Sequence, residues 1–338
     1  MQVQQNFLLK KYNTFGIEVY AKYFAEFDSI NVLQEVLPSI ASGNFPILIL
    51  GGGSNILFTK NFEGLILKNE LRGISVIKED DEFVYVQAGA GENWHQFVLY
   101  CLQKNLSGVE NLSLIPGNVG ASPMQNIGAY GVEIKDVFYE LEAFHLKEKT
   151  GTRFDSIACE FGYRDSIFKR RYKDQFAILN VTFRLNKNPQ YNISYGAIEQ
   201  ELKQMDVEEL SIHAISQAVI NIRSSRLPDP GVIGNAGSFF KNPTMPGKNF
   251  DELKKIYFDI PSYIVNQDHV KIPAAWLIEQ CGWKGYKKGD AGVHVKQALV
   301  LVNYGKASGK EIYQLSEEIK NSVKQKFNID LEREVNII

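Results

Sequence analysis

The sequence has few cysteines and no long apolar runs. Its three cysteines, Cys101, Cys159 and Cys281, lie far apart with no Cys-x-x-Cys spacing, so we expect neither a disulfide framework nor a metal site. They are predicted to be buried as small hydrophobic side chains. No apolar run approaches the roughly 18 residues of a membrane span, and the first residues lack a signal-peptide pattern. We therefore expect a cytoplasmic protein without a membrane partner.

Excess charge of one sign is also missing. The 338 residues carry a formal net charge of -2, with 22% charged and 44% hydrophobic residues. A chain this close to neutrality has no basic surplus of the kind that nucleic-acid binding requires, so no nucleic-acid partner is expected. The length is sufficient for two or three domains.

Strand and helix patterns occur together, which predicts an α+β protein. Short apolar runs and period-two stretches indicate strands, and apolar positions three or four apart indicate helices. The expected strands are 45–50, 64–68, 83–87, 175–185 and 298–302, and the expected helices are 94–101 and 273–280.

The end of the chain carries the clearest local signals. Ser308 and Glu311 form a capping-box pattern, and Ile312, Leu315, Ile319 and Val323 then fall on one face of a helix. Residues 329–337 alternate at period two and predict a strand that closes onto a sheet formed earlier in the chain.

A glycine loop, Gly51-Gly-Gly-Ser-Asn55, follows the expected strand 45–50. Glycines let backbone amides gather around a phosphate. The dinucleotide pattern Gly-x-Gly-x-x-Gly fails because Ile56 replaces its last glycine, and Ile56-Leu57 replaces the Gly-Lys of a P-loop. A tight turn at a sheet edge remains an open alternative.

A second glycine-rich segment, 115–131, reads IPGNVGASPMQNIGAYG and has no charged side chain. A solvent-exposed loop would normally carry charge, and a core element would not carry four glycines. Backbone donors and acceptors with small side chains suit a flat, uncharged, hydrogen-bonding ring such as a flavin. An ordinary glycine-rich turn system is the alternative.

Three polar residues could carry chemistry. Ser238, in GNAGSFFKNP, could be a nucleophile, a proton donor or a turn residue; no histidine is near it in sequence, and no Gly-x-Ser-x-Gly elbow surrounds it. Arg164 could pair with Asp165 or with another carboxylate. Glu334 falls on the polar side of the alternating tail, where a solvated carboxylate is the ordinary interpretation.

Several long motifs, in order and spacing, resemble the UDP-N-acetylenolpyruvoylglucosamine reductase family, and the resemblance spans nearly the whole chain. The motifs are GGGSNIL, the segment from NLSLIPG to GAYG, FGYRDS (161–166), IRSSRLPDP (222–230), GNAGSFFKNP and the terminal LEREV (331–335). Ser194-Tyr195-Gly196 resembles the tyrosine loop of the longer subtype of this family.

The resemblance implies an FAD-binding fold of the vanillyl-alcohol-oxidase type in two subdomains, with a C-terminal α+β substrate-binding domain. Prolines and glycines cluster between Leu227 and Asn249, which favours a domain boundary there. The expected domains are FAD-binding subdomain 1 (1–66 and 328–338), FAD-binding subdomain 2 (67–226) and the substrate-binding domain (227–327).

The implied activity uses non-covalent FAD and NADPH to reduce the enolpyruvyl ether of UDP-N-acetylglucosamine to UDP-N-acetylmuramate, a peptidoglycan precursor. The implied partners are NADPH and the UDP-sugar, and the protein is expected to be a monomer. A flavin oxidase of the same fold and a nucleotide-sugar binding protein without turnover are the alternatives. An oxidase would be expected to lack Arg164, Ser238 and Glu334 together, and a protein that has lost turnover is disfavoured because these residues are retained.

The same resemblance assigns the site residues. Arg164 would stabilise the enolate, Ser238 would donate the proton, and Glu334 would polarise the substrate or relay the proton. Expected FAD contacts are Gly51, Gly52, Gly53, Ser54, Asn55, Ile115, Pro116, Gly117, Gly120, Ser122, Gln125, Asn126, Gly128, Tyr130, Gly131 and Arg223. Expected substrate contacts are Tyr163, Tyr195, Arg226, Lys241 and Asn242. Many relatives have Lys where this chain has Arg226, so its contact differs in reach and geometry.

Overall fold

A computed structural model describes residues 3–40 and 45–338. The chain packs into two compact units, the first made of Met1–Phe7, Tyr20–Gly53 and Glu63–Ser225, the second of Leu8–Val19, Ser54–Phe62 and Arg226–Ile338. The three-domain division expected from the sequence stays a prediction. Within the described ranges, no helix is both long and apolar enough to cross a membrane.

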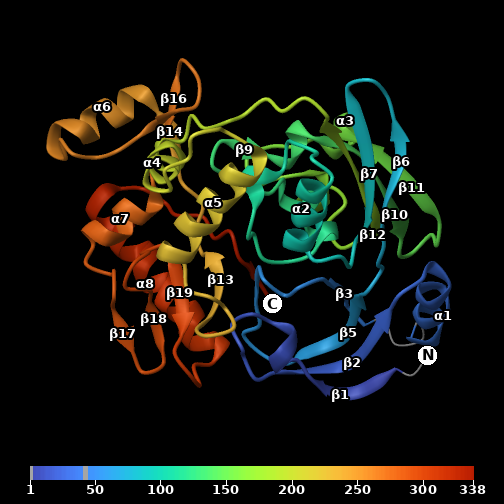
Figure 1. Cartoon of the computed structure of the whole chain (residues 1–338). Helices are drawn as coiled ribbons and strands as arrows, with labels where there is room; N and C mark the ends of the chain where they lie inside the picture. Colours follow the sequence, from blue (N-terminus) through green and yellow to red (C-terminus); the bar gives the residue numbers. More distant parts are fainter. Residues whose placement is uncertain (1–2, 41–44) are drawn as a thin grey trace. The chain divides into compact units, whose positions relative to one another are not determined.

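Unit 1 contains a four-stranded sheet in the order β1-β2-β5-β3 (Figure 1). Its strands β3 and β5 are parallel, with Ile47 opposite Leu65. The helix α1 (Ile30–Ile40) and the sheet share one apolar cluster that includes Leu33 and Leu67. The strands are β1 (Gln4–Leu8), β2 (Tyr20–Phe27), β3 (Ile47–Leu50) and β5 (Phe62–Asn69).

The larger sheet of unit 1 has five antiparallel strands in the order β11-β10-β12-β7-β6. These strands are β6 (Ile74–Glu79), β7 (Phe83–Gly89), β10 (Phe138–His145), β11 (Gly151–Asp155) and β12 (Phe176–Asn186). The strands expected at 83–87 and 175–185 are confirmed as β7 and β12.

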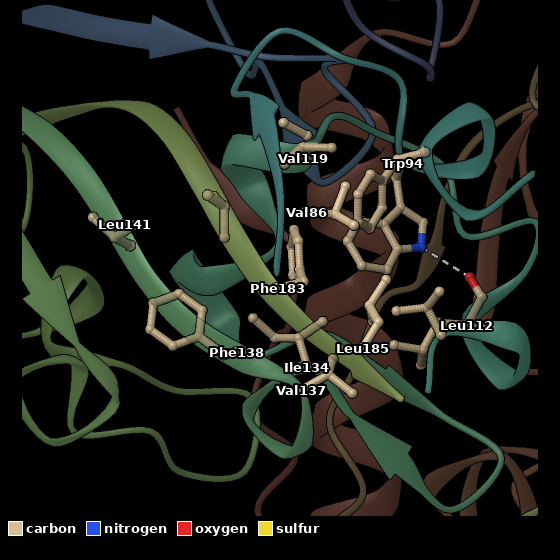
Figure 2. Packing of buried hydrophobic residues seen from close by; sticks show 14 of the residues in the cluster. Val86, Trp94, Leu112, Val119, Ile134, Val137, Phe138, Leu141, Phe183 and Leu185 are labelled. Carbon is tan, nitrogen blue, oxygen red and sulfur yellow. Dashed lines mark hydrogen bonds between the residues drawn. The ribbon is translucent and has the colours of Figure 1, made fainter. Parts of the chain in front are cut away.

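Helix α2 (Trp94–Gln103) is built by local signals and packs in the same core as this sheet. The Asn93 side chain caps its first turn by accepting from the amide of Gln96. Its buried residues recur three and four apart, beginning with Trp94 and Phe97. Figure 2 shows Trp94 close to Phe183 of β12, with its indole N–H donating to the Leu112 carbonyl at 2.9 Å. The helix expected at 94–101 is therefore confirmed.

Among the residues that the structure describes, the rest of unit 1 contains short elements and three helices. The short elements are β8 (Gly128–Ala129), β9 (Val132–Glu133) and the 3-10 turns Glu110–Leu112, Val119–Ala121, Pro123–Gln125, Ile134–Asp136 and Ile167–Lys169. The helices are α3 (Ser156–Cys159), α4 (Gly196–Gln204) and α5 (Ile212–Arg226), the last of which ends at the unit boundary.

Unit 2 has a four-stranded sheet, β13-β19-β18-β17, and a three-stranded sheet, β14-β16-β15. The helix α8 (Gly309–Phe327) begins with the expected capping box of Ser308 and Glu311, and its expected apolar face is buried. The helix expected at 273–280 is α7 (Ala274–Gln280), with Pro273 as its N-cap residue. The other elements are β13 (Gly234–Ser238), β14 (Thr244–Pro246), α6 (Gly247–Ile256), β15 (Tyr263–Ile264), β16 (His269–Lys271), β17 (Lys287–Lys288), β18 (Ala291–Val293), β19 (Val300–Asn303) and a 3-10 turn, Lys10–Tyr12.

The tail only partly forms the strand expected at 329–337. The strand β20 (Asn336–Ile337) pairs in parallel with β4 (Ile56–Leu57), while the residues before it make isolated contacts with residues 239–241. The alternation of buried and exposed residues between Ile329 and Glu332 is present. The expectation of buried cysteines is confirmed for Cys101 and Cys159, but Cys281 is only half-buried.

Candidate functional site

The two glycine segments meet inside unit 1. A Cβ on Gly52 would lie 2.8 Å from Asn118 Oδ1 and 2.9 Å from the Cα of Gly117. Only glycine allows this approach of the two backbones. The Asn118 side chain also donates to the Gly91 carbonyl, so it fixes the second glycine segment to the turn before α2.

A cavity of about 140 Å³ opens beside this junction. Gly51, Gly120 and Ala121 form its small-residue side, and a Cβ on Gly120 would lie 2.5 Å from Ala90 Cβ. The remaining wall is mainly apolar and aromatic, with Ile47, Leu48, Ile49, Asn69, Ala90, Met124, Leu146, Phe168, Tyr172, Asp174, Phe176 and Ile178. Small residues at a backbone junction and apolar walls suit part of a planar ring carried on a phosphate-linked chain, and FAD has this chemistry.

The second glycine segment ends in a tight hairpin, β8–β9. Tyr130 and Gly131 at its tip both have positive φ, +51° and +82°, as the two-residue turn that joins such strands requires. The buried Asn126 supports the hairpin by donating to Glu133 and to the Gly162 carbonyl, both at 3.0 Å. The expected cofactor residues 126–131 thus form one ordered element.

Arg164 lies at the tip of another two-residue turn, closed by the paired backbones of Gly162 and Asp165. Its Nη2 donates to the Gly128 carbonyl at 2.6 Å, and its guanidinium lies 5.5 Å from the ring centre of Tyr163. Asp165 pairs with Arg170 at 2.9 Å. The alternative in which Arg164 pairs with a carboxylate, Asp165 or another, stays open.

Arg223, on α5, belongs to the same cluster. Its Nε donates to the Leu114 carbonyl at 3.2 Å, and its side chain hydrogen-bonds with Tyr130. Burial lowers the pKa of Arg223, and Tyr130 offsets part of this effect, while the charge of Arg164 adds to it. Two guanidiniums near one hairpin give this part of unit 1 a positive potential that suits a carboxylate or phosphate.

The expected tyrosine loop is attached to the same hairpin. The Tyr195 ring meets the Tyr130 ring edge-on at 5.3 Å and precedes α4. Asn192 donates to the Gly131 carbonyl at 3.1 Å, and Asn111 donates to the carbonyls of both Tyr130 and Asn192. The structure therefore brings Arg164, Arg223, Tyr130, Tyr163 and Tyr195 together within unit 1.

Ser238 and Glu334 belong to unit 2. Ser238 ends β13, and the next residue, Phe239, accepts a hydrogen bond from the Glu334 amide at 2.9 Å. The Asn55 side chain donates to the Glu334 carbonyl at 3.3 Å. The last residue of the first glycine loop, the serine motif and the terminal motif are thus joined by hydrogen bonds.

The three expected substrate contacts of unit 2 have different surroundings. Lys241 forms an ion pair with Glu332 at 2.5 Å. The Asn242 side-chain oxygen accepts from the Ala274 amide at 2.9 Å and so supports the start of α7. Arg226 is exposed at the end of α5.

The remaining expected FAD contacts are also placed. Ser122 is buried and donates to the Val119 carbonyl at 2.7 Å. Gly53 and Ser54 are consecutive residues on the two sides of the unit boundary. Ile115, Pro116 and Gln125 lie in unit 1, in the segment that precedes the β8–β9 hairpin.

Sequence reasoning missed three residues that hold these loops: His95, Asn111 and Asn118. Asn111 and Asn118 are buried, and His95 accepts from the Leu114 amide through Nδ1 at 3.0 Å. Asn118 lies inside the second glycine segment, Asn111 lies four residues before it, and His95 lies in the expected helix 94–101. The position of Asn111 and Asn118 in or near that segment was the available signal, because a buried polar side chain needs hydrogen-bond partners.

Two family models match the chain. Residues 21–151 match an FAD binding domain. Residues 229–338 match the C-terminal domain of UDP-N-acetylenolpyruvoylglucosamine reductase.

Among similar proteins, the UDP-N-acetylenolpyruvoylglucosamine reductases of Flavobacterium johnsoniae and Amoebophilus asiaticus are each 49% identical to this chain, over 100% of both proteins. The reductase of Bacteroides fragilis is 46% identical over 99% of this chain and all of its own length.

Two solved structures are similar in fold. The UDP-N-acetylenolpyruvylglucosamine reductase of Thermus caldophilus aligns with a TM-score of 0.70 and 22% identity, covering 100% of this chain and 99% of its own. A p-cresol methylhydroxylase aligns with a TM-score of 0.50 and 10% identity, covering 95% of this chain and 84% of its own. The expected fold, an α+β FAD-binding fold of the vanillyl-alcohol-oxidase type with a C-terminal domain, is confirmed.

Proposed function

Since this chain is an FAD-binding oxidoreductase of the UDP-N-acetylenolpyruvoylglucosamine reductase family, we propose that it uses NADPH to reduce the enolpyruvyl ether of UDP-N-acetylglucosamine. The product is UDP-N-acetylmuramate, a precursor of peptidoglycan. We further assign the enzyme to the cytoplasm, where this nucleotide sugar would be made, and to a monomeric state.

The chemistry that FAD supplies when bound is transfer of a hydride from NADPH to the terminal methylene carbon of the enolpyruvyl group. The carbon–carbon double bond is reduced, and the electron pair moves onto the carbon beside the carboxylate. NADPH becomes NADP⁺. The protein must then stabilise that negative charge and deliver one proton to the same carbon.

Arg164 stabilises the enolate-like charge. Its guanidinium is fixed at a hairpin tip by the Gly128 carbonyl, so it needs no rearrangement when the charge develops. A prepositioned donor of this kind contributes about 3 kcal/mol in the transition state. Arg223, beside the same hairpin, adds positive potential there.

Ser238 donates the proton. A hydroxyl is a weak acid, but the carbanion that it meets is strongly basic, so the transfer needs no histidine beside the serine. Ser238 is half-buried at the end of β13. Glu334 polarises the substrate or relays the proton, and its backbone is held next to the serine motif by Phe239.

The two glycine segments would hold FAD. In unit 1, Gly51, Gly120 and Ala121 line the cavity, and Asn118 keeps the loops in contact. Asn126, Gly128 and Tyr130 would provide hydrogen bonds and a flat surface. Tyr163, Tyr195, Arg226, Lys241 and Asn242 would contact the UDP-sugar, with arginine able to bind phosphate through two parallel hydrogen bonds.

The structural observation that carries the proposal is the hydrogen bond between the Glu334 amide and the Phe239 carbonyl. It links the terminal motif to the serine motif within unit 2, although they are almost 100 residues apart in the sequence. The bond holds the Glu334 backbone beside the residue that follows Ser238, which supports the assignment of both motifs to one site.

The test is the visible absorption spectrum of the purified protein without oxygen, recorded before NADPH, after NADPH and after the enolpyruvyl UDP-sugar. A yellow protein that bleaches with NADPH and regains its colour only with the UDP-sugar has the proposed donor and acceptor. A protein that stays bleached after the UDP-sugar does not have this function. Bleaching by an alcohol or sugar and recolouring by oxygen would identify an oxidase instead.

A further inference from the structure

Leu114 has an unusual backbone conformation for a branched residue. Its φ is +58°, in the left-handed region that side chains other than glycine rarely adopt. It directly precedes Ile115, the first residue of the uncharged glycine-rich segment. Such a conformation persists only where surrounding groups hold it.

Two side chains hold Leu114, one at each backbone polar group. Its N–H donates to His95 Nδ1 at 3.0 Å, and its carbonyl accepts from Arg223 Nε at 3.2 Å. His95 is the second residue of α2, and Arg223 lies on α5 (Figure 1). Leu114, the residue before the proposed flavin-binding segment, is thus hydrogen-bonded to two helices that are far apart in sequence.

The hydrogen bond to the Leu114 carbonyl also orients Arg223. The same guanidinium hydrogen-bonds with Tyr130, while the Tyr130 carbonyl accepts from Asn111 at 3.0 Å. Displacement of Leu114 would remove one of the contacts that fix Arg223 beside the hairpin. The beginning and the end of the glycine-rich segment are therefore held through one arginine.

We propose that His95, with Nδ1 unprotonated, is a positioning residue that keeps Leu114 in its left-handed conformation and so preforms the glycine-rich segment for FAD. This proposal rests on the proposed function only in that the segment binds FAD. His95 acts through Leu114 and is assigned no step in the reaction.

The charges around His95 favour the form that accepts a hydrogen bond. Burial lowers the pKa of His95 below the ordinary value of 6.5, and the positive charge of Arg223, on α5, lowers it further. The packed segment 113–118 contains no titratable side chain. Glu92, one turn before His95 in the chain, accepts from the Gly73 amide at 2.6 Å and lies 3.9 Å from Arg72.

Two variants separate the acceptor from the rest of the imidazole. His95→Asn places an amide oxygen near the position of Nδ1, while His95→Leu has a similar shape and no acceptor. Retention of FAD is measured on the holoenzyme by the flavin fluorescence released on dilution. His95→Leu should release FAD about 10-fold more readily, because the Leu114 amide loses its partner, and His95→Asn should stay within about 3-fold of the parent.

The pH profile gives the second readout. In the parent, FAD retention should fall as pH decreases below 6.5, because protonated Nδ1 cannot accept from Leu114. His95→Asn should lack this step. If His95→Leu does not fold, the pH profiles of FAD retention in the parent and in His95→Asn still test the proposal.

Equal FAD retention in the parent and a folded His95→Leu protein would overturn the proposal, as would the same pH profile in the parent and His95→Asn. These results concern FAD retention alone. A failure of the proposed function would appear separately, as a bleached holoenzyme that the UDP-sugar does not recolour.

Discussion

The amide of Glu334 donates a 2.9 Å hydrogen bond to the carbonyl of Phe239. The next contacts continue in antiparallel register, with a bridge between Phe240 and Arg333 and a bond from the Lys241 amide to the Glu332 carbonyl. The backbone of the terminal motif is therefore paired with residues 239–241, directly after Ser238. This pairing shows that the terminal motif is packed against the serine motif and is not a free surface tail.

Ser238→Ala should separate the two halves of the reaction. Bleaching by NADPH should keep its parent rate, while formation of the reduced UDP-sugar should fall roughly 10²–10⁴-fold, the usual contribution of a general acid. Stopped-flow absorbance measures both halves. Ser75→Ala, at an exposed serine of β6, is the control and should behave as the parent. Parent-rate product formation by Ser238→Ala would disprove the assignment.

Arg164→Lys should slow product formation roughly 10²–10³-fold, because lysine keeps the charge but not the planar guanidinium that bonds the Gly128 carbonyl. The matched control is the neighbouring Asp165→Asn, which removes a partly exposed ion pair with Arg170. Such pairs contribute about 0–1 kcal/mol, so turnover should change little. An equal loss of turnover in both folded variants would contradict the assigned role of Arg164.

Gly120→Ala should destabilise the protein and weaken FAD retention. Its new Cβ would lie 2.5 Å from Ala90 Cβ and 3.1 Å from Ala90 backbone atoms, so the loop must shift, at a cost of about 1–3 kcal/mol. A thermal ramp that follows flavin fluorescence measures both effects. Gly151→Ala, where nothing lies within 4 Å of the new Cβ, is the control. The same melting temperature in both variants would count against a tight junction.

Glu110→Gln should change how stability depends on pH. Burial raises the pKa of Glu110 above its ordinary 4.5, and the Gly108 amide, which donates to the carboxylate, only partly opposes this. The folded state thus holds the proton more tightly than the unfolded state, and the parent loses free energy of unfolding as pH rises from 4.5 through the folded pKa. The glutamine variant lacks this loss.

The measurement is urea unfolding of parent and variant between about pH 4 and 8. Glu199→Gln is the control, and it should change the pH dependence of stability in the opposite direction. Lys203 lowers the pKa of Glu199, so the contribution of Glu199 is present above its ordinary value and is lost as pH falls. If the free energy of unfolding depends on pH in the same way in the parent and in Glu110→Gln, burial does not raise the pKa of Glu110.

Local patterns were enough for many elements. Ser308 and Glu311 specified the start of α8, and the apolar spacing in α2 specified its buried face. These signals could be read because caps and helical periodicity depend on residues within one or two turns. The strand expected at 329–337 was too long, because period-two alternation does not reveal where a partner strand stops.

The sequence by itself determined local elements such as the capped start of α8. Its motifs predicted that two glycine segments hold a planar cofactor and indicated Arg164, Ser238 and Glu334 as the residues to test. Only the tertiary structure decided that Asp165 pairs with Arg170 and that Arg164 bonds the Gly128 carbonyl. It also decided that His95 and Arg223 hold Leu114. These contacts join residues that are distant in sequence or that compete for one partner, so their outcome depends on how the chain packs and not on any local pattern.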